Sequence, residues 1–389
     1  MIRVLQVGNF ESDRQLSMQR YARLMSGLFD ENDGVAVHTI SAKPILSRRA
    51  ETGSAWEKWA GYVDKFALFP RQLRQEYRKL KAEEPNTLVH ILDHSNAPFI
   101  HAVDPGHCLI TCHDLFAVES AVGMHSRNPV RWSGRRLQGM IARGLRRSRH
   151  VATVSGFTRR RFESLFPSSK RQVEVVHSAF DRMFRPLPES KARWAVASWQ
   201  LPYSRPWTFA IGNNSWYKNR SGLLRIFNQV LKLYDGPVEQ RPMLLIAGSL
   251  ATAEQMRWIR QSKLEGDIRH LGMVSDEEVQ AFYSLSKVMV HPSFYEGFGW
   301  PPLEAQACGC PVIAGNGGAL TEVLADSALL VDPGRERLFA QSWSRLLQDA
   351  EWRLAFKEKG LRNVRRFSFN QMHNGYLKMY RSILGYSER

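Results

Sequence analysis

Short apolar runs alternate with amphipathic stretches along the whole chain. In the first half, apolar residues at helical spacing predict helices over residues 15–29 and 70–80. Apolar runs of four to six residues predict buried strands at 2–7, 35–40, 88–92, 108–112, 151–154 and 173–176. Buried strands that alternate with helices are typical of a parallel sheet covered on both faces.

The same pattern restarts after a proline-rich stretch. Four prolines within residues 186–206 predict a linker, in which residues 191–199 could form a short helix. Predicted strands follow at 207–211, 243–247, 268–271, 288–290, 311–314 and 328–331, with helices at 221–233, 277–284, 303–307 and 337–348.

The two sets of elements predict an α/β protein of two Rossmann-like, doubly wound domains that face one another across a cleft. The N-terminal domain covers residues 1–185, the linker residues 186–206 and the C-terminal domain residues 207–370. Residues 371–389 are expected to form a C-terminal helix that packs back on the N-terminal domain. Ligands of such sheets bind at the carboxyl ends of the strands.

Charge is the unusual feature of the composition. The chain of 389 residues has 54 Lys and Arg against 37 Asp and Glu, a net charge of +17. Residues 127–171 are the extreme case, with thirteen basic residues and one acidic residue, Glu163. Such an excess favours an anionic partner, which at this point could be nucleic acid, a membrane surface or a phosphorylated substrate.

Several classes of protein are excluded or disfavoured. No run approaches 18 apolar residues, so no spanning helix is predicted. The N-terminus lacks the pattern of a secretory signal, which favours a cytoplasmic protein. The spacing of the histidines matches no common metal site. The four cysteines form neither a zinc nor a redox motif and are expected to be small buried residues in a reducing cytosol: Cys108, Cys112, Cys308 and Cys310.

Two glutamates stand out behind the strand predicted at residues 288–290. Glu296 lies in a loop beside Gly297 and Gly299, and Glu304 opens a predicted helix behind two prolines. Glycines let a backbone approach a ligand closely and present N–H donors, and proline suits the first turn of a helix. A glutamate in that turn could simply complement the helix dipole. The combination with the glycine loop favours a ligand site.

This stretch resembles the signature of the retaining glycosyltransferases of family 4, which have the GT-B architecture. That signature is a pair of glutamates separated by seven residues, followed by small residues and Gly-x-Pro-Val-Ile. The likeness covers residues 207–335 strongly and the first half weakly. The matching residues are Glu296, Gly297, Phe298, Gly299, Pro302, Leu303, Glu304, Ala305, Gly309, Pro311, Val312, Ile313, Gly317, Gly318, Glu322, Val323 and residues 330–333.

The resemblance implies roles for these residues. Glu304 would accept hydrogen bonds from the ribose hydroxyls of a nucleotide sugar, and Glu296 would face the transferred sugar near its reacting carbon. Backbone amides of Gly297, Phe298 and Gly299 would hold the sugar hydroxyls and phosphate. These roles fit the residue types, because carboxylates accept from hydroxyls and glycine loops suit close contact with anions.

A second loop of the C-terminal half resembles the family's phosphate-binding loop. It runs from Gly212 and Asn213 to Lys218 and Asn219, behind the strand predicted at 207–211. Lys218 would stabilise the charge on the leaving diphosphate; its alternative is a solvated surface lysine. Asn213 stands where many members of the family have an arginine, so one expected cation is missing from the loop.

Three residues of the first half are expected at the site, His113 as a catalytic residue beside Glu296 and Lys218, and Gly8 and Ser155 on the acceptor side or in the cleft. His113 follows the strand at 108–112 and resembles the family histidine that reaches toward the donor sugar; it could also be a core or capping histidine. Ser155 is either the N-cap of a helix or a polar residue that lines the cleft. Gly8 follows the first strand and could permit close approach of a ligand.

The resemblance implies a retaining glycosyltransferase that moves a hexose from a nucleoside diphosphate sugar to an acceptor hydroxyl. Mannose from GDP-mannose is the leading donor, ahead of UDP-sugars. The mechanism would be front-face displacement, with neither a metal nor another cofactor required. The expected acceptor is a saccharide, on a lipid of cell-surface polysaccharide synthesis.

Three further possibilities concern partners. The helix predicted within residues 132–147 could lie on an anionic membrane, at its inner face, or could pack its apolar stripe on the domain core. A nucleic-acid-binding protein that uses residues 127–171 is the rival hypothesis, although no nucleic-acid motif supports it. A phosphorylase with pyridoxal phosphate is a third, for which no matching segment is found.

Overall fold

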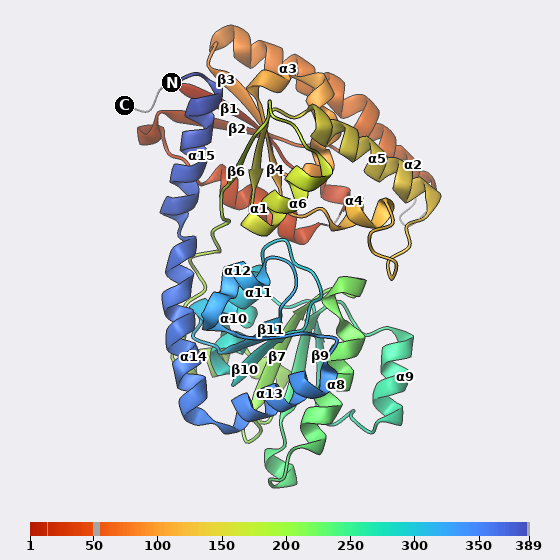
Figure 1. Cartoon of the computed structure of the whole chain (residues 1–389), viewed down its shortest axis with the longest axis vertical. Coiled ribbons are helices and arrows are strands. Elements are labelled where there is room, and N and C mark those ends of the chain that lie inside the picture. Colours follow the sequence, from red (N-terminus) through yellow and green to blue (C-terminus); the bar gives the residue numbers. More distant parts are fainter. Residues whose placement is uncertain (14, 50–54, 387–389) are drawn as a thin grey trace. The chain divides into compact units, whose positions relative to one another are not determined.

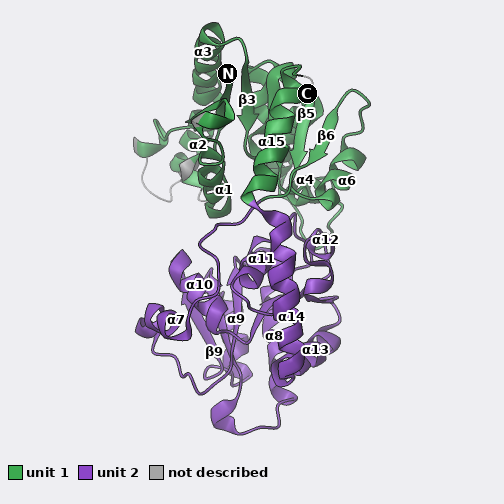
Figure 2. Ribbon diagram, turned by 90° about the vertical axis from the view of Figure 1, so that its left-hand side faces the viewer, with its two compact units in different colours: residues 1–178, 369–389 green, residues 179–368 purple. Residues whose placement is uncertain are grey.

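The computed structural model describes residues 1–13, 15–49 and 55–386 and divides into two compact units (Figures 1 and 2). Unit 1 comprises Met1–Ser178 and Phe369–Arg389, and unit 2 comprises Ala179–Ser368. Each unit contains a parallel sheet of six strands with helices on both faces. The predicted α/β class with two Rossmann-like sheets is therefore confirmed.

The sheet of unit 1 has the strand order β2-β1-β3-β4-β5-β6. Its strands are β1 (Ile2–Val7), β2 (Val35–Ile40), β3 (Thr87–Ile91), β4 (Cys108–Cys112), β5 (His150–Thr153) and β6 (Gln172–Val175). Its α-helices are α1 (Leu16–Ser26), α2 (Ala55–Val63), α3 (Phe69–Glu83), α4 (Phe116–Ala121), α5 (Trp132–Arg147), α6 (Gly156–Leu165) and α15 (Phe369–Ile383). A π-helical segment, η4 (Asp64–Leu68), joins α2 to α3, and the 3₁₀ segment η5 (His94–Ala102) follows β3.

The sheet of unit 2 has the strand order β12-β11-β10-β7-β8-β9. Its strands are β7 (Trp207–Gly212), β8 (Met243–Gly248), β9 (Ile268–Gly272), β10 (Val288–His291), β11 (Val312–Gly315) and β12 (Leu329–Val331). Its α-helices are α7 (Glu189–Ala195), α8 (Arg220–Lys232), α9 (Ala253–Gln261), α10 (Asp276–Leu285), α11 (Trp300–Ala307), α12 (Leu320–Leu324), α13 (Glu336–Gln348) and α14 (Ala350–Asn363).

Residues 186–206, where the prolines predict a linker, lie within unit 2. They contain α7, which packs beside α10, and residues before and after α7 form hydrogen bonds with α10. Trp199 Nε1 donates to Glu278 Oε1 at 2.8 Å, and Gln280 Nε2 donates to the Met183 carbonyl at 2.6 Å. The stretch is ordered because its side chains find partners on α10, which proline content alone does not reveal.

Helix α15 packs in unit 1 through buried tyrosines. Tyr376 Oη lies 2.5 Å from Tyr21 Oη and 3.0 Å from Thr111 Oγ1, and Tyr380 Oη lies 2.8 Å from His90 Nδ1. Burial lowers the pKa of His90 to about 3, so this imidazole is neutral at ordinary pH. Hydrogen bonds thereby join α15 to β3, β4 and α1.

The apolar stripe of α5 faces the core of unit 1. Ile141 and Leu145 are buried in the cluster that the central strands form, and Leu137 packs against it. This helix was expected either to lie on a membrane or to pack its apolar stripe on the domain core. In the structure the stripe packs on the core, and the arginines of the helix face solvent. All four cysteines are buried and free, as predicted. None of the helices among the described residues has the length and hydropathy that a membrane span requires.

Candidate active site

Lys218, Glu296 and His291 form a polar cluster in unit 2, at the point where the strand order of its sheet reverses. The chain runs from β7 outward to β8 and β9, and then returns to the other side of β7 to form β10. Loops at the carboxyl ends of such neighbouring strands diverge and leave a crevice, which is where doubly wound sheets bind ligands. Here the loop after β7 carries Lys218, and the loop after β10 carries Glu296.

Glu296 is held by two cationic or polar neighbours. Lys218 Nζ lies 2.7 Å from Oε1 and 3.0 Å from Oε2 of Glu296. Nε2 of His291, the last residue of β10, lies 2.7 Å from Oε1 of the same carboxylate. Since an ionised carboxylate only accepts hydrogen bonds, Nε2 of His291 carries the proton. The side chains of Glu296 and Lys218 are 10% and 17% exposed, so the pair is largely shielded from water.

The charge states follow from these contacts. Burial alone would raise the pKa of Glu296, but the nearby Lys218 and His291 outweigh burial and hold it well below its usual value. Burial lowers the pKa of His291, and the Glu296 carboxylate offsets only part of that effect. At neutral pH the cluster therefore consists of a carboxylate, an ammonium group and a neutral imidazole.

The backbone of Glu296 is fixed by the loop after β11. The N–H of Ala319 donates to the Glu296 carbonyl at 2.8 Å. Gly318 has a φ of +66°, and a Cβ added there would lie 2.6 Å from Glu296 N and closer still to its carbonyl oxygen. The loop after β7 is tied to the same region, because Phe294 N donates to the Tyr217 carbonyl at 2.7 Å. Three loops thus set the position of one carboxylate.

The second glutamate and the glycine loop lie directly beyond Glu296. Helix α11 begins at Trp300, three residues earlier than predicted, because Gly299 takes a φ of +110° as its N-cap and two prolines occupy the first turn. Glu304 is therefore in the second turn and is 3% exposed. The ring of Phe298 packs edge-on against Phe367 with centroids 5.4 Å apart. Its side chain anchors the loop that contains Gly297.

The loop after β7 is shaped by its own side chains. Oδ1 of Asn213 accepts from Ser215 N at 3.0 Å, so this asparagine closes a turn. Asn219 has a φ of +54° and is the N-cap residue of α8. The Gly212 carbonyl accepts from Arg220 Nη2 at 2.6 Å.

Arg220 is a buried cation that the sequence did not single out. Only 7% of it is exposed, and burial lowers its pKa to about 10. Its Nη2 also reaches the Ala247 carbonyl at 3.4 Å, while Nη1 has no hydrogen-bond partner among the described residues. No signal in the sequence separates this arginine from a solvated residue in the first turn of a helix.

Two of the three site residues predicted in unit 1, His113 and Ser155, lie at the carboxyl ends of β4 and β5, and Gly8 follows β1. His113 Nε2 lies 2.9 Å from the Leu92 carbonyl, and its ring contacts Tyr21 edge-on with centroids 4.5 Å apart. Burial lowers the pKa of His113, partly offset by Asp93. Ser155 accepts from Thr158 N at 3.1 Å and caps α6. Its side chain therefore has the capping role that was one of its two interpretations.

A buried polar cluster at the reversal point of the unit 1 sheet was missed. Asn9 follows β1 and Asp93 follows β3, and Asn9 Nδ2 lies 2.5 Å from Asp93 Oδ2. Burial alone would raise the pKa of Asp93, but neighbouring histidines and hydrogen bonds lower it to about 2. Asn96 Nδ2 reaches the Gly8 carbonyl at 3.5 Å. At Gly8 itself an added Cβ would meet only ordinary contacts at 3.8 Å or more, so packing within unit 1 does not demand glycine.

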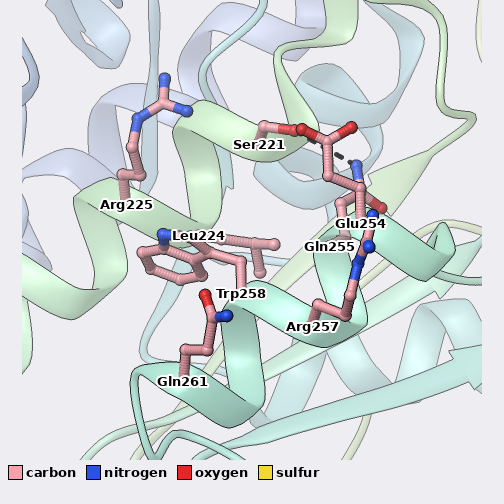
Figure 3. Close-up of a pocket in the computed structure, with 8 residues that line it drawn as sticks. All are labelled: Ser221, Leu224, Arg225, Glu254, Gln255, Arg257, Trp258 and Gln261. Carbon is pink, nitrogen blue, oxygen red and sulfur yellow. Dashed lines mark hydrogen bonds between the residues drawn. The ribbon is translucent and has the colours of Figure 1, made fainter.

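A separate hollow of about 350 Å³ opens between α8 and α9 of unit 2 (Figure 3). Trp258 and Leu224 form its apolar part, with glutamine and charged side chains around them. None of the residues of the Glu296 cluster lines it. Among the described residues, no three His, Cys, Asp or Glu side chains are grouped in a way that could hold a metal ion.

Comparisons with known proteins agree with this geometry. Residues 196–363, most of unit 2, match the family model of glycosyl transferases group 1. The chain is 28% identical to O-antigen chain mannosyltransferase B of Escherichia coli over 275 residues, and this alignment covers 70% of each chain. Sucrose-phosphate synthase of Thermosynechococcus elongatus matches all of both chains with a TM-score of 0.73 at 18% identity. Anabaena HepE, solved with UDP and glucose, matches 98% of this chain and all of its own with a TM-score of 0.71 at 14% identity.

The protein is thus a glycosyltransferase with the GT-B fold. Its match to the model of glycosyl transferases group 1 covers residues 196–363. This family match covers the loops that carry Lys218, Glu296 and Glu304.

Proposed function

We propose that the protein is a retaining glycosyltransferase of family 4 that transfers mannose from GDP-mannose to a hydroxyl group of a growing saccharide. The observation that carries the proposal is the Lys218–Glu296–His291 cluster at the reversal point of the unit 2 sheet. The choice of mannose is supported by the mannosyltransferase relative, whose name also supports an O-antigen or similar lipid-linked polysaccharide as acceptor.

In the proposed reaction, the bond between the anomeric carbon and the diphosphate oxygen breaks, and the acceptor oxygen bonds the same face of that carbon. The acceptor proton passes to the leaving diphosphate. Lys218 stabilises the negative charge on that diphosphate, because a fixed cation in a shielded site acts more strongly than one in water. Glu296 orients the sugar and in turn holds Lys218. Glu304 accepts from the ribose hydroxyls.

The donor assignment is tested by measuring transfer from a panel of nucleotide sugars to a mannose-containing acceptor. GDP-mannose should be the preferred donor, and Glu304→Gln should raise the KM for the donor by at least about tenfold, because a buried hydroxyl partner is lost. Glu254→Gln, an exposed glutamate of the same unit, is the matched control and should behave as wild type. Binding of no nucleotide sugar by the wild type would contradict the proposal.

The stereochemical assignment needs its own measurement. The anomeric configuration of the first product, followed by NMR, should match that of the α-linked donor. A product with inverted configuration would show that the acceptor attacks from the opposite face and would exclude the front-face mechanism. Activity in the presence of a chelator tests the expectation that no metal is required.

A further inference from the structure

Helix α2 exposes a row of large apolar side chains on unit 1. Trp56 is 65% exposed, Trp59 69%, Tyr62 48% and Val63 39%. Positions 56, 59 and 63 lie on one face of a helix because they follow one another at intervals of three and four residues. We refer to Trp56, Trp59, Tyr62 and Val63 as the α2 stripe.

The α2 stripe stands on a well-anchored element. Tyr62 stacks on Phe66 with ring centroids 6.1 Å apart, and Phe66 lies 6.1 Å from the buried ring of Phe99 in η5. Asp64, which follows the helix, accepts backbone N–H groups of Leu46 and Ser47 at 2.9 Å. The segment that follows the helix is therefore fixed by packing and hydrogen bonds, and Ala60 within the helix is buried. The exposure of the α2 stripe is thus a property of the folded unit.

Exposed apolar residues are ordinary when they are scattered, but a row of them marks an interaction site. The composition of the row indicates its partner. Tryptophan and tyrosine have an apolar body and a polar group, and they are enriched where proteins meet the interface between lipid and water. Two tryptophans and a tyrosine on nine residues of helix are typical of a segment that lies in that interface.

Helix α5 adds positive charge close to this element. Both helices flank η5: Phe66 next to α2 packs on Phe99, and a Cβ at Gly144 of α5 would overlap the backbone of Ala97. The α5 arginines that face solvent form no ion pair with any described residue. They are Arg135, Arg136, Arg143, Arg146 and Arg147.

We propose that the α2 stripe inserts into the interfacial region of an anionic phospholipid bilayer, with the α5 arginines adding electrostatic attraction. This surface differs from a single basic amphipathic helix, since Leu137, Ile141 and Leu145 of α5 pack on the core of unit 1 and α2 supplies the inserting stripe. The proposal rests on the proposed function only in its purpose, which is to place the enzyme where a lipid-linked acceptor is found.

Flotation of the full chain with vesicles tests this surface. Wild type should bind vesicles of phosphatidylcholine mixed with phosphatidylglycerol, and bind phosphatidylcholine alone much more weakly. The Trp56→Ala/Trp59→Ala double variant should lower the partition coefficient at least about tenfold, because the inserting area is removed. Brominated lipids should quench the tryptophan fluorescence of wild type more than that of the double variant.

Two matched variants separate the two parts of the surface. Trp194→Ala removes an 82% exposed tryptophan of α7 in unit 2 and should leave vesicle binding unchanged. Arg143→Gln/Arg147→Gln should weaken binding to the anionic vesicles only, and salt should weaken it in the same way.

Several results would overturn the proposal. One is a Trp56→Ala/Trp59→Ala variant that floats as the wild type does. Another is a wild type that binds neutral and anionic vesicles equally, and a third is self-association of the chain through the α2 stripe without lipid binding. Strong binding of duplex DNA by a wild type that ignores vesicles would favour a nucleic-acid partner instead. Sugar transfer to a water-soluble saccharide, measured without vesicles, tests the proposed function separately from membrane binding. The double variant should retain that transfer, and a wild type that floats without transferring any sugar would refute the proposed function alone.

Discussion

Gly318→Ala tests whether the loop after β11 sets the position of Glu296, because it changes no functional group. The added Cβ meets the backbone of Glu296, 2.6 Å from its nitrogen, and the residue must keep a φ of +66°. Alanine in the left-handed region costs about 1–2 kcal/mol. Relief of the overlap costs about 1–3 kcal/mol more, the usual range for an overpacked core. We expect unfolding to become easier by about 2–5 kcal/mol in total.

The overlap can be separated from the backbone term by a second glycine of unit 2. Gly272 has a φ of +65°, and a Cβ there would meet only Leu250 Cδ2 at 3.5 Å, an ordinary contact. Gly272→Ala should therefore show the cost of the backbone conformation alone, about 1–2 kcal/mol. The difference between the two variants, measured by urea unfolding followed through tryptophan fluorescence, reports the overlap with Glu296.

Gly318→Ala should also slow sugar transfer, because it displaces the Glu296 backbone in the folded protein. If the Glu296 backbone moves by about 1 Å, the rate should fall about 100-fold, as is common when a positioned group is displaced. Gly34→Ala in unit 1, with a φ of +66° and nothing within 4 Å of the added Cβ, is the control for activity and should transfer sugar as wild type does. The reasoning would be refuted if Gly318→Ala transferred sugar like the wild type and lost no more stability than Gly272→Ala.

Three further predictions concern titratable residues of the two units. Lys218→Met should lower kcat by about 100-fold or more, because a cation that faces the leaving group is lost; an unchanged kcat would rule out that role. Arg220→Met should destabilise unit 2 by about 1–3 kcal/mol in urea unfolding, since the Gly212 carbonyl loses a buried donor, and Arg220→Lys should restore part of it. His90 has a pKa of about 3 in the folded chain and about 6.5 when unfolded, so its contribution to stability is present above pH 6.5 and is lost as the pH falls toward 3. His90→Asn should show a shallower dependence of the urea midpoint on pH in that window, and an equal dependence would contradict the assignment.

The architecture could be predicted from hydrophobic pattern alone because the central strands, such as β3 and β4, are buried along their whole length and read as continuous apolar runs. Observed strand ends lie within one or two residues of the predicted ones, as in β1 at Ile2–Val7 and β8 at Met243–Gly248. The start of α11 was placed too late, since Trp300 and the prolines read as loop. Helix α2 was not predicted, although its apolar positions 56, 59 and 63 have helical spacing, and that spacing alone does not show that they face solvent.

The site was predicted as a list of residues and not as a set of contacts. Lys218 and Glu296 are 78 positions apart, and only the adjacency of β7 and β10 brings them to 2.7 Å. His291 lies one residue beyond the predicted strand and was not singled out, although its imidazole bonds the same carboxylate. Asp93 and Arg220 gave no signal, because burial converts an ordinary charged residue into a strongly perturbed one and the sequence does not show burial at loop positions.

The net charge of +17 shows the same limit, because a count does not say which charges are already used. Within the basic stretch, Arg161 pairs with the buried Glu119 at 2.5 Å, and Arg171 donates to the backbone carbonyls of Ser148 and Arg146. These arginines hold unit 1 together and contribute little to long-range attraction. The solvent-facing arginines of α5 lack such partners, so they supply the part of the excess that an anionic surface can meet. The partner is thus indicated by where charge is left unpaired, and the neighbouring tryptophans of α2 favour lipid over nucleic acid.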